Sequence, residues 1–149
     1  MPTPPDSTAP VFDYAVDHCC LSVPDLESSI LWYRDILGFA VERQFSVPEI
    51  SARGAMLSRR AFRIELFEVP GAAVMSSDRR DVHLDLKTHG TKHFALEVAN
   101  IDAAVAALKQ RGVEFAKELT RMSPARSFAF TRDNSGNLIE LLERHDKSA

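Results

Sequence analysis

Two histidines and two glutamates recur at matching positions in the chain. His18 precedes Glu65 by 47 residues (65 − 18), and His93 precedes Glu140 by the same interval (140 − 93). The two pairs are therefore offset by 75 residues. Two imidazoles and two carboxylates are a ligand set that a divalent transition metal with open coordination positions accepts. The spacing predicts a metal site formed by His18, Glu65, His93 and Glu140, and a shell of this kind accepts Zn, Ni, Co, Mn or Fe.

The repeat extends well beyond the four polar residues. The same offset of 75 superimposes apolar residues on apolar residues, carrying Leu21, Val23, Leu26, Ile30 and Tyr33 onto Leu96, Val98, Ile101, Val105 and Leu108. Gly38 and Gly112 fall one residue out of this phase, which indicates a small insertion or deletion between the halves. The chain therefore contains an internal duplication of two related modules. Each module has about 55 residues and needs the other to complete a core.

Composition places the chain among single globular domains and excludes several classes of function. Its 149 residues are 45% hydrophobic and 26% charged, which is ordinary for a folded domain. The net charge of −3 disfavours nucleic-acid binding. No apolar run reaches the roughly 20 residues of a membrane span, and the N-terminus lacks the features of a signal peptide. Because Cys19 and Cys20 are adjacent and unsuited to a structural disulfide, we expect a reducing, cytoplasmic setting.

The positions of turn residues and apolar periodicity divide the chain into elements. Residues 1–12 are rich in Pro, Ser and Thr and are predicted to form a mobile tail, followed by one domain at 13–149. Module 1 occupies about 14–70, a connection 71–91, and module 2 about 92–144. The predicted strands are 17–23, 39–45, 52–58 and 62–69 in the first module and 93–98, 113–118, 127–131 and 138–143 in the second. Helices are predicted from Pro24-Asp25 to Gly38 and over 101–110. The result is an α+β fold of two tandem β-α-β-β-β modules.

Strand alternation places the candidate ligands on one kind of surface. Successive side chains of a strand point to opposite faces, so His18 shares a face with Cys20, while Leu21 and its neighbours lie under the helix. By the same rule all four candidate ligands lie on sheet faces turned away from the helices, toward one concave surface. Glu68 and Glu143 also repeat, but they have the opposite parity, and we interpret them as solvated strand ends.

Several other polar residues are weaker candidates. Glu97 faces inward and is interpreted as a polar rim residue, with a supporting base as the alternative. Cys20 would lie near the metal, although neutral thiols are mostly inert. Four arginines are assigned to loops, where one or two of them could receive an anionic group of a substrate: Arg79, Arg80, Arg121 and Arg126.

Over about residues 14–144 the chain resembles the vicinal oxygen chelate superfamily, which includes glyoxalase I, methylmalonyl-CoA epimerase, extradiol dioxygenases and drug-binding resistance proteins. The motifs that carry the resemblance are Asp17-His18, Trp32-Tyr33, Leu37-Gly38-Phe39, Ile64-Glu65-Leu66, Lys92-His93-Phe94-Ala95-Leu96 and Asp133-Asn134-Ser135-Gly136-Asn137-Leu138-Ile139-Glu140-Leu141. The resemblance implies paired modules that form a cupped mixed sheet around a metal, commonly in a homodimer.

Departures from the motifs bear on the branch of the superfamily. Glyoxalase I has the same quartet, but Ser22, Val69 and His89 stand where its glutathione contacts would be an arginine, an asparagine and an arginine. The epimerase branch usually has glutamine in place of Glu65, although Glu49 stands near the position of its glutamate base. Ring-cleaving dioxygenases use two histidines and one carboxylate, so the additional carboxylate counts against them. Drug-binding members without a metal have lost these ligands, and this chain has all four.

The resulting functional hypothesis is a metal-dependent lyase or isomerase of the glyoxalase type. It would act on a small molecule with vicinal oxygens through an enediolate-like intermediate, with Glu140 and Glu65 as the residues that move a proton between adjacent carbons. The alternatives are an Fe(II)-dependent ring-cleaving dioxygenase and a small-molecule-binding protein without catalysis. A homodimer is expected, and each metal site is either contained in one chain or shared between two.

Overall fold

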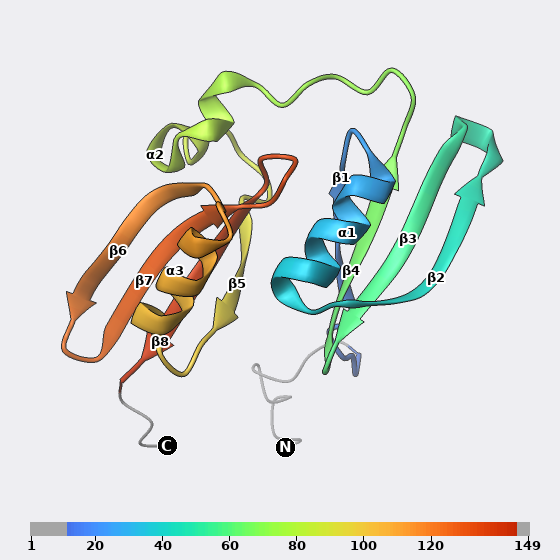
Figure 1. Ribbon diagram of the computed structural model, residues 1–149. Helices are drawn as coiled ribbons and strands as arrows, with labels where there is room; N and C mark the ends of the chain where they lie inside the picture. Colours follow the sequence, from blue (N-terminus) through green and yellow to red (C-terminus); the bar gives the residue numbers. More distant parts are fainter. Residues whose placement is uncertain (1–11, 146–149) are drawn as a thin grey trace, which may run out of the picture.

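The computed structural model describes residues 12–145 and contains two four-stranded mixed sheets, each with a helix on one face (Figure 1). All but the last residue of the tail predicted at 1–12 lies outside the described residues. In the first half the elements are β1 (His18–Ser22), α1 (Leu26–Leu37), β2 (Ala40–Val47), β3 (Ala52–Arg59) and β4 (Phe62–Glu68). In the second half they are β5 (His93–Glu97), α3 (Ile101–Gln110), β6 (Phe115–Ser123), β7 (Arg126–Arg132) and β8 (Leu138–Arg144). The predicted α+β class and the tandem β-α-β-β-β order are confirmed.

The two sheets repeat the same strand order and almost the same register. The orders are β1-β4-β3-β2 and β5-β8-β7-β6, with β1 parallel to β4 and β5 parallel to β8. Glu65 lies opposite Met56 of β3, and Glu140 lies opposite Phe130 of β7. The glutamates are offset by 75 residues and their partners by only 74 (130 − 56), the same offset as that of the two glycines. One residue is therefore missing from the second half near the end of α3 and is regained in the turn before β8.

Both long helices begin and end where their capping residues predict. The Asp25 carboxylate accepts a hydrogen bond from the Ser28 backbone N–H at 2.8 Å, and the Asn100 side chain accepts one from Ala103 N–H at 2.9 Å. Gly38 ends α1 in the left-handed conformation with φ 71°, which an L side chain adopts only at a cost.

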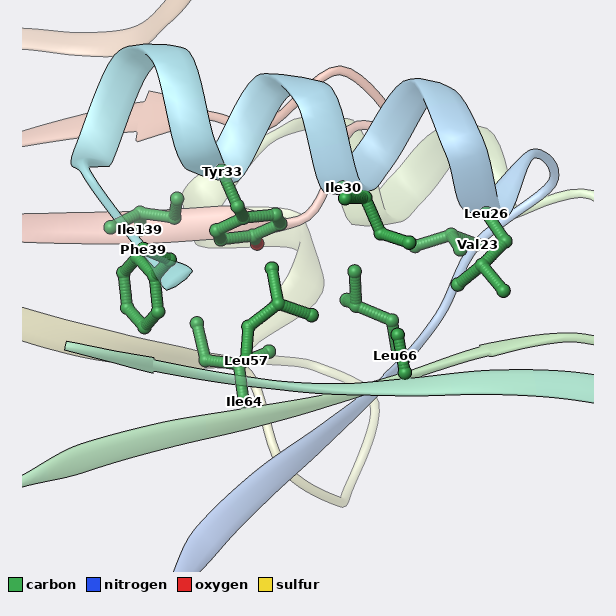
Figure 2. Packing of buried hydrophobic residues seen from close by; sticks show 10 residues of the cluster. Val23, Leu26, Ile30, Tyr33, Phe39, Leu57, Ile64, Leu66 and Ile139 are labelled. Carbon is green, nitrogen blue, oxygen red and sulfur yellow. The ribbon is translucent and has the colours of Figure 1, made fainter. Parts of the chain in front are cut away.

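The main core lies between α1 and the first sheet and also includes residues of the second half. Leu26, Ile30 and Tyr33 of α1 pack over Leu57, Ile64 and Leu66, and Ile139 of β8 completes the cluster (Figure 2). Phe94 and Leu96 of β5 pack against its edge. Since one core contains side chains from both halves, the modules form a single folding unit, as their size requires.

A buried hydrogen bond also ties the two halves together. The Tyr33 hydroxyl donates to the Asp133 carboxylate at 2.9 Å, across 100 residues of sequence. Asp133 also accepts from the backbone N–H groups of Ser135 and Asn137. Burial and the neighbouring carboxylate raise the pKa of Tyr33, so its hydroxyl remains a donor. The segment predicted only as a turn at 133–137 therefore also fixes the position of α1.

The connection between the modules is structured. It contains a 3₁₀ turn at Ser77–Arg80 and the short helix α2 at Val82–Asp85. Asp85 is almost completely buried, and its Oδ1 pairs with the Arg79 guanidinium and the Lys92 ammonium, each at 3.2 Å. This connection leaves β4 and enters β5 at the same end of the molecule (Figure 1). Because β1 is parallel to β4, β1 and β5 run in opposite directions.

Two interpretations from the sequence are wrong. Glu68 and Glu143 are not solvated strand ends: their carboxylates accept hydrogen bonds from Leu26 N–H at 2.7 Å and Ile101 N–H at 2.9 Å, the first residues of α1 and α3. The bond from Leu26 is the main cause of a lowered pKa at Glu68. Strand parity placed these glutamates on the correct face, but it could not show that a helix begins above them.

The second correction concerns two of the arginines assigned to loops. Arg121 lies in β6 and Arg126 in β7. Arg121 forms an exposed ion pair with Asp102 of α3. The sequence before Arg121 contains few turn-forming residues, so β6 continues through Arg121. The β6–β7 turn is short, and β7 begins at Arg126 immediately after it.

Candidate metal centre

The first histidine–glutamate pair lies on adjacent strands of the first sheet. His18 begins the edge strand β1, and Glu65 lies on its neighbour β4, directly opposite Cys20. His18 Nε2 is 3.4 Å from Glu65 Oε2, and the two side chains are 35% and 17% exposed. The predicted face is confirmed, because Cys19, Leu21, Ile64 and Leu66 point to the other side, into the core under α1. The pair is therefore accessible and turned away from the helix.

The orientation of His18 is set by Asp17. The Asp17 carboxylate lies 2.6 Å from His18 Nδ1 and also accepts a hydrogen bond from Arg63 at 3.0 Å. The contact with His18 is the main cause of a lowered pKa at Asp17. With the proton on Nδ1, the lone pair of Nε2 faces the Glu65 carboxylate, which is also an acceptor. In that tautomer both atoms are free to bind one metal cation, and a carboxylate behind a histidine is the arrangement that supports a metal-binding imidazole.

The second pair has the same geometry in different surroundings. His93 Nε2 lies 3.2 Å from Glu140 Oε2, and the side chains are 30% and 14% exposed. The ring of Phe130 packs edge-on against the His93 imidazole, with a centroid distance of 4.9 Å. The residue before His93 is Lys92, whereas Asp17 precedes His18. The histidine–glutamate pair is thus the same in both halves, but the residue that precedes the histidine differs.

Within one chain the two pairs lie at separate places. A cavity between β1 and β5 is lined by His93 at the start of β5 and by residues 19–23 along β1, whereas His18 and Glu65 do not line it. These strands run in opposite directions (Figure 1), so His18 and His93, each the first residue of its strand, lie at opposite ends of the strand pair. Within residues 12–145 no three His, Cys, Asp or Glu side chains gather as a metal would require. The chain therefore presents two half-sites, each with one nitrogen and one oxygen donor.

The donor types fit a divalent transition metal. One imidazole and one carboxylate in each half-site would together supply the two-nitrogen, two-oxygen shell expected from the sequence. Cys20 lies opposite Glu65 on the neighbouring strand, and partial burial and then the Glu65 charge raise the pKa of its thiol in the metal-free chain.

The weaker candidates lie outside the half-sites. Glu97 is exposed at the end of β5, with its carboxylate 3.9 Å from the Arg144 guanidinium. Glu49 is exposed in the 3₁₀ turn Pro48–Ile50. Two of the arginines, Arg79 and Arg80, line the cavity beside His93. Asp17 has a supporting role that the strand pattern does not predict, and the sequence signal for this role is its position immediately before His18.

Comparison with known proteins identifies the class to which this fold and site belong. Residues 15–141 match the Glyoxalase/Bleomycin resistance protein/Dioxygenase superfamily, and the chain belongs to it. Human mitochondrial methylmalonyl-CoA epimerase is 27% identical over 134 residues, covering 85% of this chain and 72% of the epimerase. The uncharacterized protein YaeR of Escherichia coli K12 is 30% identical over 132 residues, covering 87% and 95%. Lactoylglutathione lyase of Schizosaccharomyces pombe is 26% identical over 157 residues, covering 94% and 51%.

Solved structures show the same architecture. A glyoxalase family protein from Enterococcus faecalis superimposes with a TM-score of 0.73 at 22% identity, covering 87% of this chain and 97% of that one. Glyoxalase I of Leishmania major, described as trypanothione-dependent, superimposes with a TM-score of 0.66 at 26% identity, covering 88% and 87%. Among the described residues, no helix is long and apolar enough to cross a membrane.

Proposed function

We propose that the protein is a metal-dependent lyase or isomerase that acts on a small molecule with neighbouring oxygen atoms. The observation that carries this proposal is the pair of half-sites, in each of which a histidine nitrogen faces a glutamate oxygen at 3.2–3.4 Å. Relatives that are an epimerase and a lyase support the reaction class. We propose the cytoplasm as its setting, because the adjacent Cys19 and Cys20 are unsuited to a structural disulfide.

The residues of the chain have distinct roles in this proposal. His18, Glu65, His93 and Glu140 would hold the divalent ion, which when bound supplies Lewis acidity toward the oxygens of the substrate. Glu140 and Glu65 are the proton-moving residues: their side chains are only 14% and 17% exposed, so their carboxylates are partly shielded from water. Asp17 keeps the proton of His18 on Nδ1 and its Nε2 free.

We further propose a homodimer in which each metal site takes His18 and Glu65 from one subunit and His93 and Glu140 from the other. The support is that no three of these side chains gather within the described residues of one chain, together with the accessible faces of the two half-sites. β1 is also an edge strand of the first sheet and β5 an edge strand of the second, and edges of this kind are normally covered by a neighbouring element or subunit. A two-fold axis would produce two equivalent sites.

The proposed class can be tested by metal removal and restoration. Protein purified without an affinity tag is analysed for bound metal, depleted with a chelator, and assayed for isomerisation or lyase activity on 2-hydroxy and 2-oxo carbonyl compounds as each metal is restored. We expect activity to vanish on depletion, to return with at least one metal, and to proceed without oxygen uptake. Metal-dependent oxygen consumption would instead identify a dioxygenase, and ligand binding unchanged by the chelator would identify a binding protein.

A further inference from the structure

The cavity between β1 and β5 is basic in an otherwise acidic chain. It has a volume of about 490 Å³, within the usual range for small-molecule sites, and the connection between the modules passes over it. Three of the described residues that line it are cationic, Arg79, Arg80 and Lys92, and none is a carboxylate. The whole chain has a net charge of −3. The cavity lining is therefore positively charged, although the net charge of the whole chain is negative.

The acidic groups behind the cavity leave this positive charge incompletely neutralised. Asp85 is the one carboxylate shared by Arg79 and Lys92, at 3.2 Å from each. Glu114 is likewise shared by Arg80 and the buried Arg132, again at 3.2 Å from each. Among these ion pairs, one carboxylate faces two cations in each case. Each group of three ionised side chains therefore keeps one positive charge in excess.

The cationic side chains also retain free hydrogen-bond donors. Arg79 uses its Nε toward Asp85 and one Nη toward the Thr91 carbonyl, out of five N–H donors in a guanidinium. Lys92 uses one of its three donors toward Asp85. The buried Asp85 carboxylate positions Arg79 and Lys92 but leaves several of their N–H donors free. This preorganised arrangement is suited to an incoming anion.

We propose that this cavity is an anion subsite, which binds the phosphate or carboxylate group of the molecule whose oxygen-bearing end reaches the His93–Glu140 half-site. The proposal rests on the proposed function for the identity of that molecule, because His93 lines the same cavity. Apolar side chains such as Leu21, Val23 and Phe94 share the wall, so the ligand combines an anionic group with an apolar portion. The substrate class is therefore a small organic phosphate or carboxylate.

The test measures anion binding separately from metal binding. Inorganic phosphate and malonate are titrated calorimetrically, at low ionic strength, into the metal-depleted protein and into Arg80→Gln and Lys92→Met. Loss of a charge-assisted hydrogen bond is expected to weaken binding about tenfold or more in each variant. The matched control is Arg121→Gln, which removes the same charge from β6 outside the cavity and should leave the affinity unchanged. Melting curves verify that each variant is folded.

The outcomes distinguish the two proposals. Binding of phosphate alone assigns an organic phosphate, and binding of malonate alone assigns a carboxylate. His93→Ala should lose metal but keep anion binding. If the wild-type protein binds anions but no metal, the proposed function is overturned and the anion subsite stands. The subsite is overturned if neither anion binds, if both cavity variants bind as the wild type does, or if Arg121→Gln weakens binding as much as they do.

Discussion

Alanine substitution of His18, His93 or Glu140 is expected to remove most of the bound metal and, with it, the activity. Each side chain supplies one of only four proposed donors, and it faces its partner at 3.2–3.4 Å. Loss of an outer-shell partner of a metal ligand typically costs 10–100-fold in affinity, so loss of a ligand should cost at least about 100-fold. Metal content per chain, measured by mass spectrometry after dialysis against a competing chelator, would show this directly.

Two further variants make that experiment specific. Asp17→Asn should give an intermediate loss of about 10–100-fold, because His18 keeps its place but loses the carboxylate on Nδ1. Glu97→Gln, an exposed carboxylate on β5 outside both half-sites, should keep full metal content. The thermal stability of the metal-loaded protein should follow metal content, since metal bound to the folded state stabilises it. Wild-type metal content in all three ligand variants would contradict a shared site.

The largest loss of stability is expected from Tyr33→Ala. Tyr33 is fully buried in the core between α1 and the first sheet, and its ring packs edge-on against Trp32 and Phe39. Truncation of a large buried aromatic side chain costs about 3–5 kcal/mol, a large part of the roughly 5–15 kcal/mol that stabilises a typical domain. Urea denaturation followed by circular dichroism measures the difference. Tyr14→Ala, at an aromatic residue that is 70% exposed, is the matched control and should change little.

Tyr33→Phe separates packing from the hydrogen bond to Asp133. It keeps the ring but leaves the buried carboxylate without one donor, at a cost of about 1–3 kcal/mol. Asp133 retains its three donors in the 133–137 turn, so the turn itself should persist. A loss in Tyr33→Phe as large as in Tyr33→Ala would show that the hydrogen bond, rather than the packing, holds the halves together.

The sequence was sufficient to predict the repeating unit of this fold. The helix limits at Asp25 and Gly38 and the alternation around His18 and Glu65 are local signals, and the offset of 75 residues follows from comparing the sequence with itself. All of these features appear in the structure. Glu68 and Glu143 were misassigned because their partners, the first N–H groups of the helices, lie about 42 residues away in sequence. Local patterns do not contain this information.

The relation between the modules could not be predicted either. Tyr33 and Asp133 were recognised as parts of two motifs, but nothing in either motif indicates that they meet. The expectation that all four ligands face one concave surface assumed a particular pairing of the modules. In the structure β1 and β5 run in opposite directions, and each half-site is formed by its own sheet. Strand parity determines the face of a residue, whereas packing between modules determines what that face meets.

The central claim, that four residues from two subunits form one metal site, is tested most directly in mixed dimers. His18→Ala and Glu140→Ala chains are co-expressed with two different tags that bind no metal, and dimers that carry both tags are isolated. One site then receives both substitutions and the other receives neither, so we predict one metal per mixed dimer, compared with two per wild-type dimer. Pairing His18→Ala with Glu65→Ala damages both sites and should give none. Mixed His18→Ala/Glu140→Ala dimers with no more metal than either variant alone would contradict the shared site.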